Sequence, residues 1–189
     1  MINFQSLLDK YRIKANANML LDMWNESHRH FHTLEHLNDI IDQVNENYGN
    51  GKIDEKQKEK LLLTALFHDI VYEPTRQDNE ERSAEFFMNL CEDKTNKDIL
   101  EIRDAILDTK THASQTPLAE TFNKFDMNVI ERDFESLLKW EDGIFNEYKS
   151  YGNEAYKMGR LSFLESLLDK YPQNTENLLK LIDWVKTNY

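Results

Sequence analysis

The sequence predicts an all-α protein, a compact orthogonal helical bundle in a single domain over residues 1–189. Three observations lead to this prediction. The chain holds only 5 Gly and 3 Pro, so little material is present for the tight turns of hairpins. Apolar residues recur at spacings of three and four along most of the chain, as they do on one face of a helix. No stretch of useful length alternates apolar and polar residues, and the apolar stripes are too short for a coiled coil.

Capping residues and chain breakers place several helix ends. Thr33 is suited to begin a helix that ends near residue 47, and a loop follows at 48–51. Asp54 and Gln57 have the spacing of a capping box for a helix that continues to about residue 70, before Pro74. Apolar periodicity predicts further helices over residues 4–11, 19–24, 78–91, 99–109, from 118 onward, 128–138, 144–151, 156–168 and 175–185.

Composition excludes several classes of function. The net charge of -12 is spread along the chain, which disfavours duplex nucleic acid as a partner because nonspecific affinity comes from Lys and Arg. Cys91 is the single cysteine, so neither an intramolecular disulfide nor a cysteine-based zinc site is expected. No apolar run has the length of a membrane span, and residues 1–6 do not resemble a signal peptide. We therefore expect no membrane association and a cytoplasmic location.

Two short stretches carry the chemistry. His32 and His36 lie four residues apart, and the adjacent pair His68 and Asp69 follows the apolar run 61–67. Burying an imidazole beside a carboxylate costs several kcal/mol unless both are satisfied, and a divalent cation would satisfy both. If Thr33 is the N-cap, His32 lies outside the helix and His36 in its first turn, so one can bind metal while the other faces substrate.

Other interpretations of these residues remain open. His28 and His30 show that the segment is rich in histidine, and an exposed histidine cluster is common. His68 could be a buried histidine bonded to a backbone carbonyl, with Asp69 at the polar edge of its helix. Residue type, spacing and apolar setting together favour a metal site. Imidazole and carboxylate ligands without thiolate suit Mn, Fe, Zn, Ni or Co better than Ca, with Mg also allowed, at one or two ions per chain.

The motifs of this chain resemble those of the HD-domain superfamily of metal-dependent phosphohydrolases, with its ordered H…HD…D signature. The resemblance is closer to one branch of small bacterial HD proteins. That branch has the motifs R-H-Y-H-T-x-x-H, F-H-D-x-V-Y-x-P, D-N-E-x-x-S, T-x-x-H and Y-x-x-G-R. The corresponding segments here are 29–36, 67–74, 78–83, 109–112 and 156–160. The resemblance covers the chain from about residue 24 to residue 168, with flanking helices at both ends.

The resemblance implies a set of metal ligands. Three of them are expected at His36, His68 and Asp69, and Asp69 is also expected to take part in catalysis. The fourth should be an Asp in a later helix, where the family often has two Asp separated by one residue. Here the upstream position is Lys124, and Asp133 lies further on. We therefore expect Asp126 to be the fourth ligand.

One role outside the ligand set follows from the same resemblance, and the chemistry of other side chains suggests the rest. His32 corresponds to the histidine that, in related HD phosphodiesterases, protonates the leaving group. Contacts to the substrate are expected from Arg29, Arg160, Lys110 and His112. His112 could instead bind a second metal. Asn79 and Glu80 are expected either to cap the helix that they begin or to support the metal ligands from behind.

The resulting prediction is a metal-dependent phosphohydrolase that cleaves a phosphate ester or anhydride of a small molecule, with nucleotides as the first candidates. One alternative is an HD-type oxygenase with two irons, which a second metal site at His112 would favour. Another is a noncatalytic binding module stabilised by a metal. A ferritin-like di-iron bundle is disfavoured because no Glu lies three residues before any His in the sequence.

Overall fold

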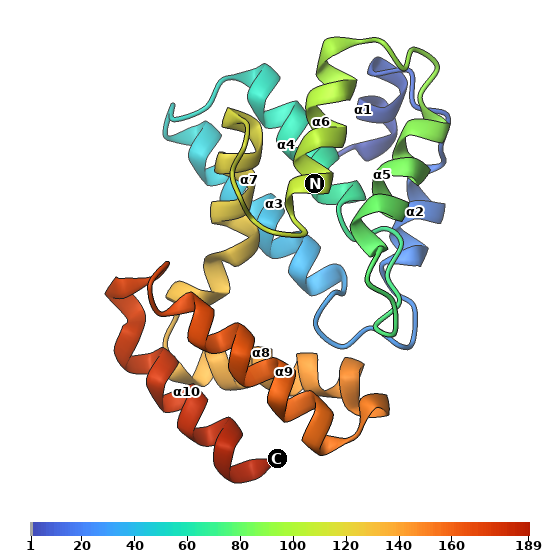
Figure 1. Ribbon diagram of the computed structural model, residues 1–189. Coiled ribbons are helices and arrows are strands. Elements are labelled where there is room, and N and C mark those ends of the chain that lie inside the picture. The colour runs from blue at the N-terminus through green and yellow to red at the C-terminus, as the bar shows by residue number, and fades with distance from the viewer. Residues whose placement is uncertain (1) are drawn as a thin grey trace. The chain divides into compact units, whose positions relative to one another are not determined.

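The computed structural model describes residues 2–189 and confirms the all-α prediction for them (Figure 1). These residues form ten α-helices and three short 3-10 helices and contain no strand; Ile13 and Cys91 form an isolated bridge. No helix among the described residues is long and apolar enough to cross a membrane. The α-helices are α1 Phe4–Lys10, α2 Ala17–Met23, α3 Leu34–Gly49, α4 Glu55–Phe67, α5 Asn79–Leu90, α6 Lys97–Asp108, α7 Pro117–Asp126, α8 Phe134–Tyr148, α9 Asn153–Leu167 and α10 Thr175–Asn188.

The described residues fall into two compact units. The first consists of the residues up to Ser27 and His32–Asp126, and the second of His28–Phe31 and Met127–Tyr189. Each unit has a hydrophobic cluster of its own. The single domain expected over residues 1–189 stays a prediction.

Helix α4 is the centre of the first unit. It packs against α3, α6 and α7, and its residues 61–67 are all buried. A helix covered on every side carries apolar residues around its whole circumference, which explains the unbroken apolar run in the sequence. The side chain of Trp24 is fully buried and its Nε1 donates to the carbonyl of Leu66, 2.9 Å away. This packing holds the C-terminal end of α4 deep in the unit.

Local capping signals place the starts of α3 and α4 as predicted. The Thr33 side chain accepts a hydrogen bond from the amide of Glu35, and Asp54 forms the full capping box with Gln57. The end of α4 differs from the prediction, because the helix stops at Phe67 rather than near residue 70. The segment after it is held by side chains of α5 instead of by helical hydrogen bonds.

Two of the helices predicted for the second unit are wrong in their bounds. Residues 128–138 do not form one helix, since Met127–Glu131 is a 3-10 helix and α8 begins only at Phe134. Asp133 stands between them as the N-cap of α8 and accepts from the amide of Ser136. Residues 144–151 are not a separate helix either, because α8 runs through them to Tyr148. Helix α8 continues past the glycine at 143, where a Cβ would lie only 3.0 Å from the Cβ of Phe31.

Candidate metal centre

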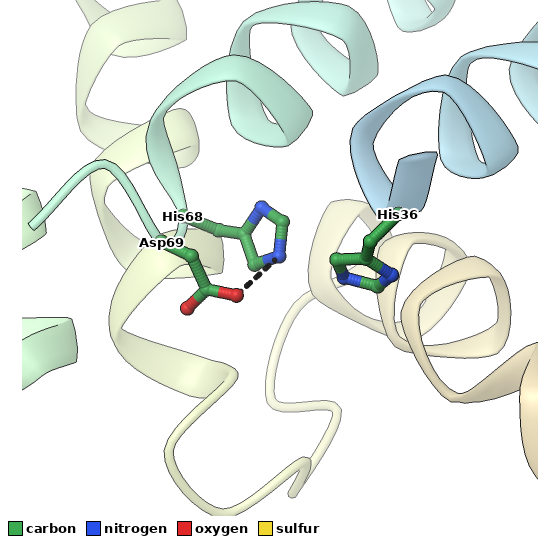
Figure 2. Close-up of side chains that lie close together, drawn as sticks. All are labelled: His36, His68 and Asp69. Atoms are coloured by element: carbon green, nitrogen blue, oxygen red, sulfur yellow. Dashed lines mark ion pairs between the residues drawn. The ribbon is translucent and has the colours of Figure 1, made fainter. Parts of the chain in front are cut away.

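Three potential metal ligands converge where α3 begins and α4 ends (Figure 2). His36 lies in the first turn of α3, while His68 and Asp69 directly follow the last residue of α4. One ligand atom from each of the three lies within 4.8 Å of the other two. His36 is 7% exposed and His68 is 1% exposed, so both imidazoles are withdrawn from water. The structure therefore brings together the three residues that the resemblance implied as the first metal ligands.

The orientation of His68 suits a metal ligand. Its Nδ1 lies 3.0 Å from the carbonyl oxygen of Ala65, and a ring nitrogen next to a carbonyl must carry the proton. In the neutral ring this leaves Nε2 with a free lone pair. Nε2 is buried and makes no hydrogen bond of acceptable geometry, although it lies 3.0 Å from Oδ2 of Asp69. The hydrogen bond to a backbone carbonyl that was considered as an alternative role for His68 is therefore present. It orients the ring through Nδ1, but it leaves Nε2 without a hydrogen bond.

Asp126 joins this cluster from the last residue of α7. Its Oδ1 lies 3.0 Å from Nε2 of His36 and 3.4 Å from Nε2 of His68. Its Oδ2 lies 2.9 Å from Nε2 of His112. Asp133, the other residue considered, belongs to the second unit and caps α8. Of the two acidic residues, Asp126 is therefore the one in contact with the two histidines.

The electrostatics of the cluster favour positive charge at its centre. Burial alone would lower the pKa of His68, but the carboxylates of Asp69 and Asp126 raise that pKa well above its usual value. Burial alone would raise the pKa of Asp126, and the neighbouring His68, His112 and His36 hold it well below its usual value. Two partly buried carboxylates facing two buried imidazole nitrogens provide the field and the donor atoms that a divalent cation requires.

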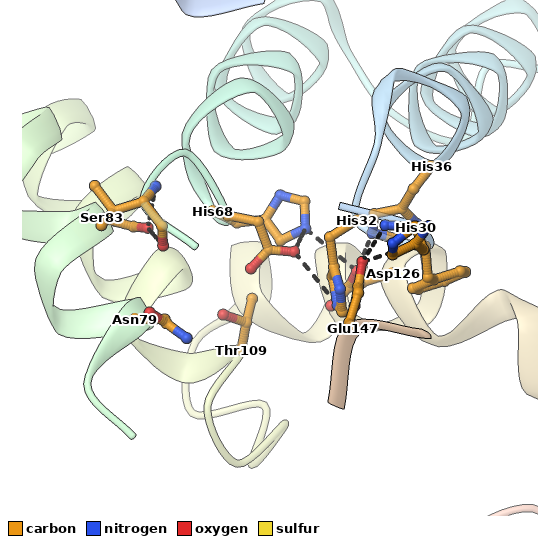
Figure 3. A network of polar contacts seen from close by, with 12 residues as sticks. His30, His32, His36, His68, Asn79, Ser83, Thr109, Asp126 and Glu147 are labelled. Atoms are coloured by element: carbon orange, nitrogen blue, oxygen red, sulfur yellow. Dashed lines mark hydrogen bonds and ion pairs between the residues drawn. The ribbon is translucent and has the colours of Figure 1, made fainter. Parts of the chain in front are cut away.

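His32 lies at the edge of the cluster (Figure 3). Its Nε2 is 3.9 Å from Oδ2 of Asp69, too far for a hydrogen bond. Its side chain is 19% exposed, compared with 5% for His36. The ring centroid of His32 lies 6.0 Å from that of His36 and 4.3 Å from that of Tyr72. His32 is therefore close to the cluster, yet more accessible to solvent than the histidines within it.

The expected substrate-binding residues divide between the two units. His112 contacts Asp126, and Lys110 lies in the same loop, where it forms an ion pair with Glu81 and donates to the carbonyl of Gln77. Arg29 and Arg160 belong to the second unit. The guanidinium of Arg160 is buried there, with Nε 2.6 Å from Oε2 of Glu141 and Cζ 4.0 Å from the Trp140 ring centre.

Asn79 and Glu80 lie at the start of α5, after the segment that follows the cluster. The expectation that Asn79 caps its helix is wrong: the N-cap is Asp78, and the Asn79 side chain bonds the backbone of Glu73. Burial raises the pKa of Glu80, and the negative charge of Asp69 adds to the shift. Glu80 therefore lies within electrostatic reach of the cluster without contacting the histidines.

Asp108 is a supporting residue that the sequence analysis missed. It ends α6, is 6% exposed, and accepts hydrogen bonds from the amides of Ser114 and Gln115 and from Nδ2 of Asn123. These bonds hold the loop that carries His112, in which His112 and Ser114 adopt left-handed backbone angles with φ of 50° and 58°. The only sequence signal was an acidic residue at the buried end of an amphipathic helix.

The chain matches no family model, no curated protein and no solved structure.

Proposed function

We propose that this protein is a metal-dependent phosphohydrolase of the HD-domain type. The observation that supports it most is the convergence of His36, His68, Asp69 and Asp126, four residues from three separate helix ends, in one largely buried cluster. Their order along the chain and the motifs around them resemble the metal-binding signature of that superfamily. The proposed substrate class, a phosphate ester or anhydride with nucleotides as first candidates, rests on this resemblance.

The donor atoms fit a divalent transition metal. His36 and His68 offer imidazole nitrogens, Asp69 and Asp126 offer carboxylate oxygens, and Nε2 of His68 is buried without a hydrogen bond. When bound, such an ion would activate a water molecule and offset the charge of a phosphoryl group. Ligands of this kind suit Mn, Fe, Zn, Ni or Co.

The positions of His32 and His112 support two further roles, proton donation and orientation of Asp126. His32 is placed outside the ligand cluster, and its protonated imidazole can donate from Nε2 to the oxygen that leaves phosphorus. Oδ2 of Asp69 lies 3.9 Å from that nitrogen. His112 bonds Oδ2 of Asp126 and so fixes the direction of its other oxygen toward His36 and His68.

An oxygenase with two irons is the second candidate. The observation that favours it is a third imidazole at the site, since His112 lies 2.9 Å from Asp126. His112 contacts the cluster through Oδ2 of Asp126, whereas Oδ1 of Asp126 faces His36 and His68, and this arrangement supports the phosphohydrolase more strongly. Counting metal ions per chain and measuring oxygen uptake by the iron-loaded protein discriminates between the two.

A metal-dependent hydrolysis assay tests the proposal. The full chain is stripped of metal, reloaded with each of the candidate ions, and assayed for phosphate release from nitrophenyl phosphates and from nucleotides. We expect turnover only with metal, and none from His68→Ala or from the isosteric Asp69→Asn, because each removes a ligand. Added metal should raise the unfolding temperature of the wild type more than that of either variant. Absence of metal binding would refute the centre, and metal binding without any hydrolysis would support the noncatalytic binding module.

A further inference from the structure

The segment after the metal cluster is held in place by two side chains of α5. Oγ of Ser83 accepts from the amide of Val71 at 3.1 Å and donates to the carbonyl of the same residue at 3.2 Å. Oδ1 of Asn79 accepts from the amide of Glu73 at 3.1 Å, and its Nδ2 donates to the carbonyl of Glu73 at 2.9 Å. Each side chain therefore satisfies both polar groups of one backbone residue.

These four bonds flank a single residue, Tyr72. Ser83 is fully buried and Asn79 is 6% exposed, and the two are four residues apart on α5, so they project from the same side of the helix (Figure 3). The segment has no regular structure, and these side chains pair the backbone of Val71 and Glu73 in place of a helical ladder. The backbone is thus fixed immediately before and immediately after Tyr72.

The ring of Tyr72 packs on the ring of His32. The side chain is buried at 7% exposure, the two ring centroids are 4.3 Å apart, and the planes are inclined by 33°. Asp69 lies 3.9 Å from His32 Nε2, too distant to orient the imidazole by a hydrogen bond. An aromatic surface held rigidly at this distance restricts the plane in which the imidazole can lie.

We propose that Tyr72 is a positioning residue for His32, and that Asn79 and Ser83 set its place by holding the backbone on either side. This inference rests on the proposed function, because it concerns the orientation of the proton donor. Tyr72 itself contributes no proton to the reaction. Its role is to keep Nε2 of His32 directed at the leaving oxygen. A displacement of about 1 Å in such a group can reduce the rate by about 100-fold.

The test combines a spectroscopic readout with turnover. In the zinc-loaded full chain, the Tyr72 ring should move the Cε1 proton of His32 upfield, with the signal assigned by comparison with His32→Gln. Tyr72→Phe should keep this shift, Tyr72→Leu should lose it, and Ser83→Ala should reduce it. Ser166→Ala, which removes a hydroxyl bonded to the carbonyl of Phe163 on the exposed surface, is the matched control and should change nothing.

Turnover should follow the same order. We expect Tyr72→Leu to lower kcat for an alkyl phosphate by about 10- to 100-fold with KM and metal content unchanged, and Tyr72→Phe to restore most of it. The loss should shrink for a nitrophenyl ester, whose leaving oxygen needs little protonation. A His32 signal identical in wild type and Tyr72→Leu, or a loss equal for both leaving groups, would overturn the positioning role. A folded, metal-loaded wild type that hydrolyses nothing would instead overturn the proposed function.

Discussion

Replacing Asp108 by alanine removes one acceptor on which a whole loop depends. The carboxylate takes hydrogen bonds of 2.8 Å from the Ser114 amide, 3.1 Å from the Gln115 amide and 2.8 Å from Nδ2 of Asn123. Ser114 has a left-handed backbone, as does His112 two residues before it. We therefore expect the variant to lose stability and to release the loop that carries His112.

The size of the effect follows from the burial of the three donors. Nδ2 of Asn123 is buried with Asp108, and a buried donor left without its acceptor costs about 1–3 kcal/mol. The amides of Ser114 and Gln115 are partly buried and can turn to water, so each bond contributes about 0.5–1.5 kcal/mol. The free energy of unfolding should thus fall by about 2–6 kcal/mol.

Urea unfolding and amide hydrogen exchange measure this loss. Asp104→Ala on the same helix is the matched control, because the Asp104 side chain is 43% exposed and pairs with the adjacent Arg103 on the surface. The control should change the free energy of unfolding by less than about 0.5 kcal/mol. Exchange at Ser114 and Gln115 should accelerate in Asp108→Ala alone. Equal stability of the two variants would refute the idea that Asp108 holds the loop.

The pH dependence gives a second check on Asp108. Burial alone would raise its pKa, but the bonds from Asn123, Gln115 and Ser114 hold the pKa below its usual value. A carboxyl group with a lowered pKa stabilises the folded state above its unfolded pKa of about 4, and this contribution is lost as pH falls through the folded value. The stability difference between wild type and Asp108→Ala should therefore stay constant from pH 7 to about pH 4 and narrow below it.

Three further predictions concern the metal ligands, the proton donor and two glycines. Asp126→Asn should weaken metal binding about 10-fold or more in calorimetric titrations, while Asp133→Asn leaves it unchanged; the reverse order would make Asp133 the ligand. His32→Ala should keep the metal but lower turnover by about 10² to 10⁴; loss of the metal would place His32 among the ligands. Gly143→Ala should destabilise the protein by about 1–3 kcal/mol, because the new Cβ would lie 3.0 Å from the Cβ of Phe31. Gly159→Ala, at an open helical position, should instead stabilise the protein by up to about 1 kcal/mol. Equal urea midpoints for the two glycine variants would contradict this.

Features that depend on residues close together in the chain were predictable from the sequence. The N-cap at Thr33 and the capping box of Asp54 and Gln57 are present as predicted, because each bond spans two or three residues. The run 61–67 indicated a buried helix, and the polar pair behind it stood out against that apolar setting. Residue types and spacing indicated a metal site near His32, His36, His68 and Asp69, and the resemblance to the HD superfamily selected His36, His68 and Asp69, which lie together in the structure.

Contacts between segments distant in sequence were decided by the tertiary structure alone. Within α8, the close approach of Phe31 to Gly143 joins residues more than a hundred positions apart. Asp126 meets two histidines because α7 packs against both α3 and α4. The partners of Asp108, by contrast, depend on how a loop folds back onto the end of its helix.

The supporting residues were the least predictable part of the site. Asn79 is of a residue type that often caps helices, yet its side chain bonds the backbone of Glu73. Ser83 likewise bonds the backbone of Val71, twelve positions away. Local sequence determined which segments become helices, because hydrogen bonds and periodicity within a helix are local. Which side chains satisfy the backbone of the irregular segments was decided by packing, because every buried polar group takes whatever partner the folded chain brings near it.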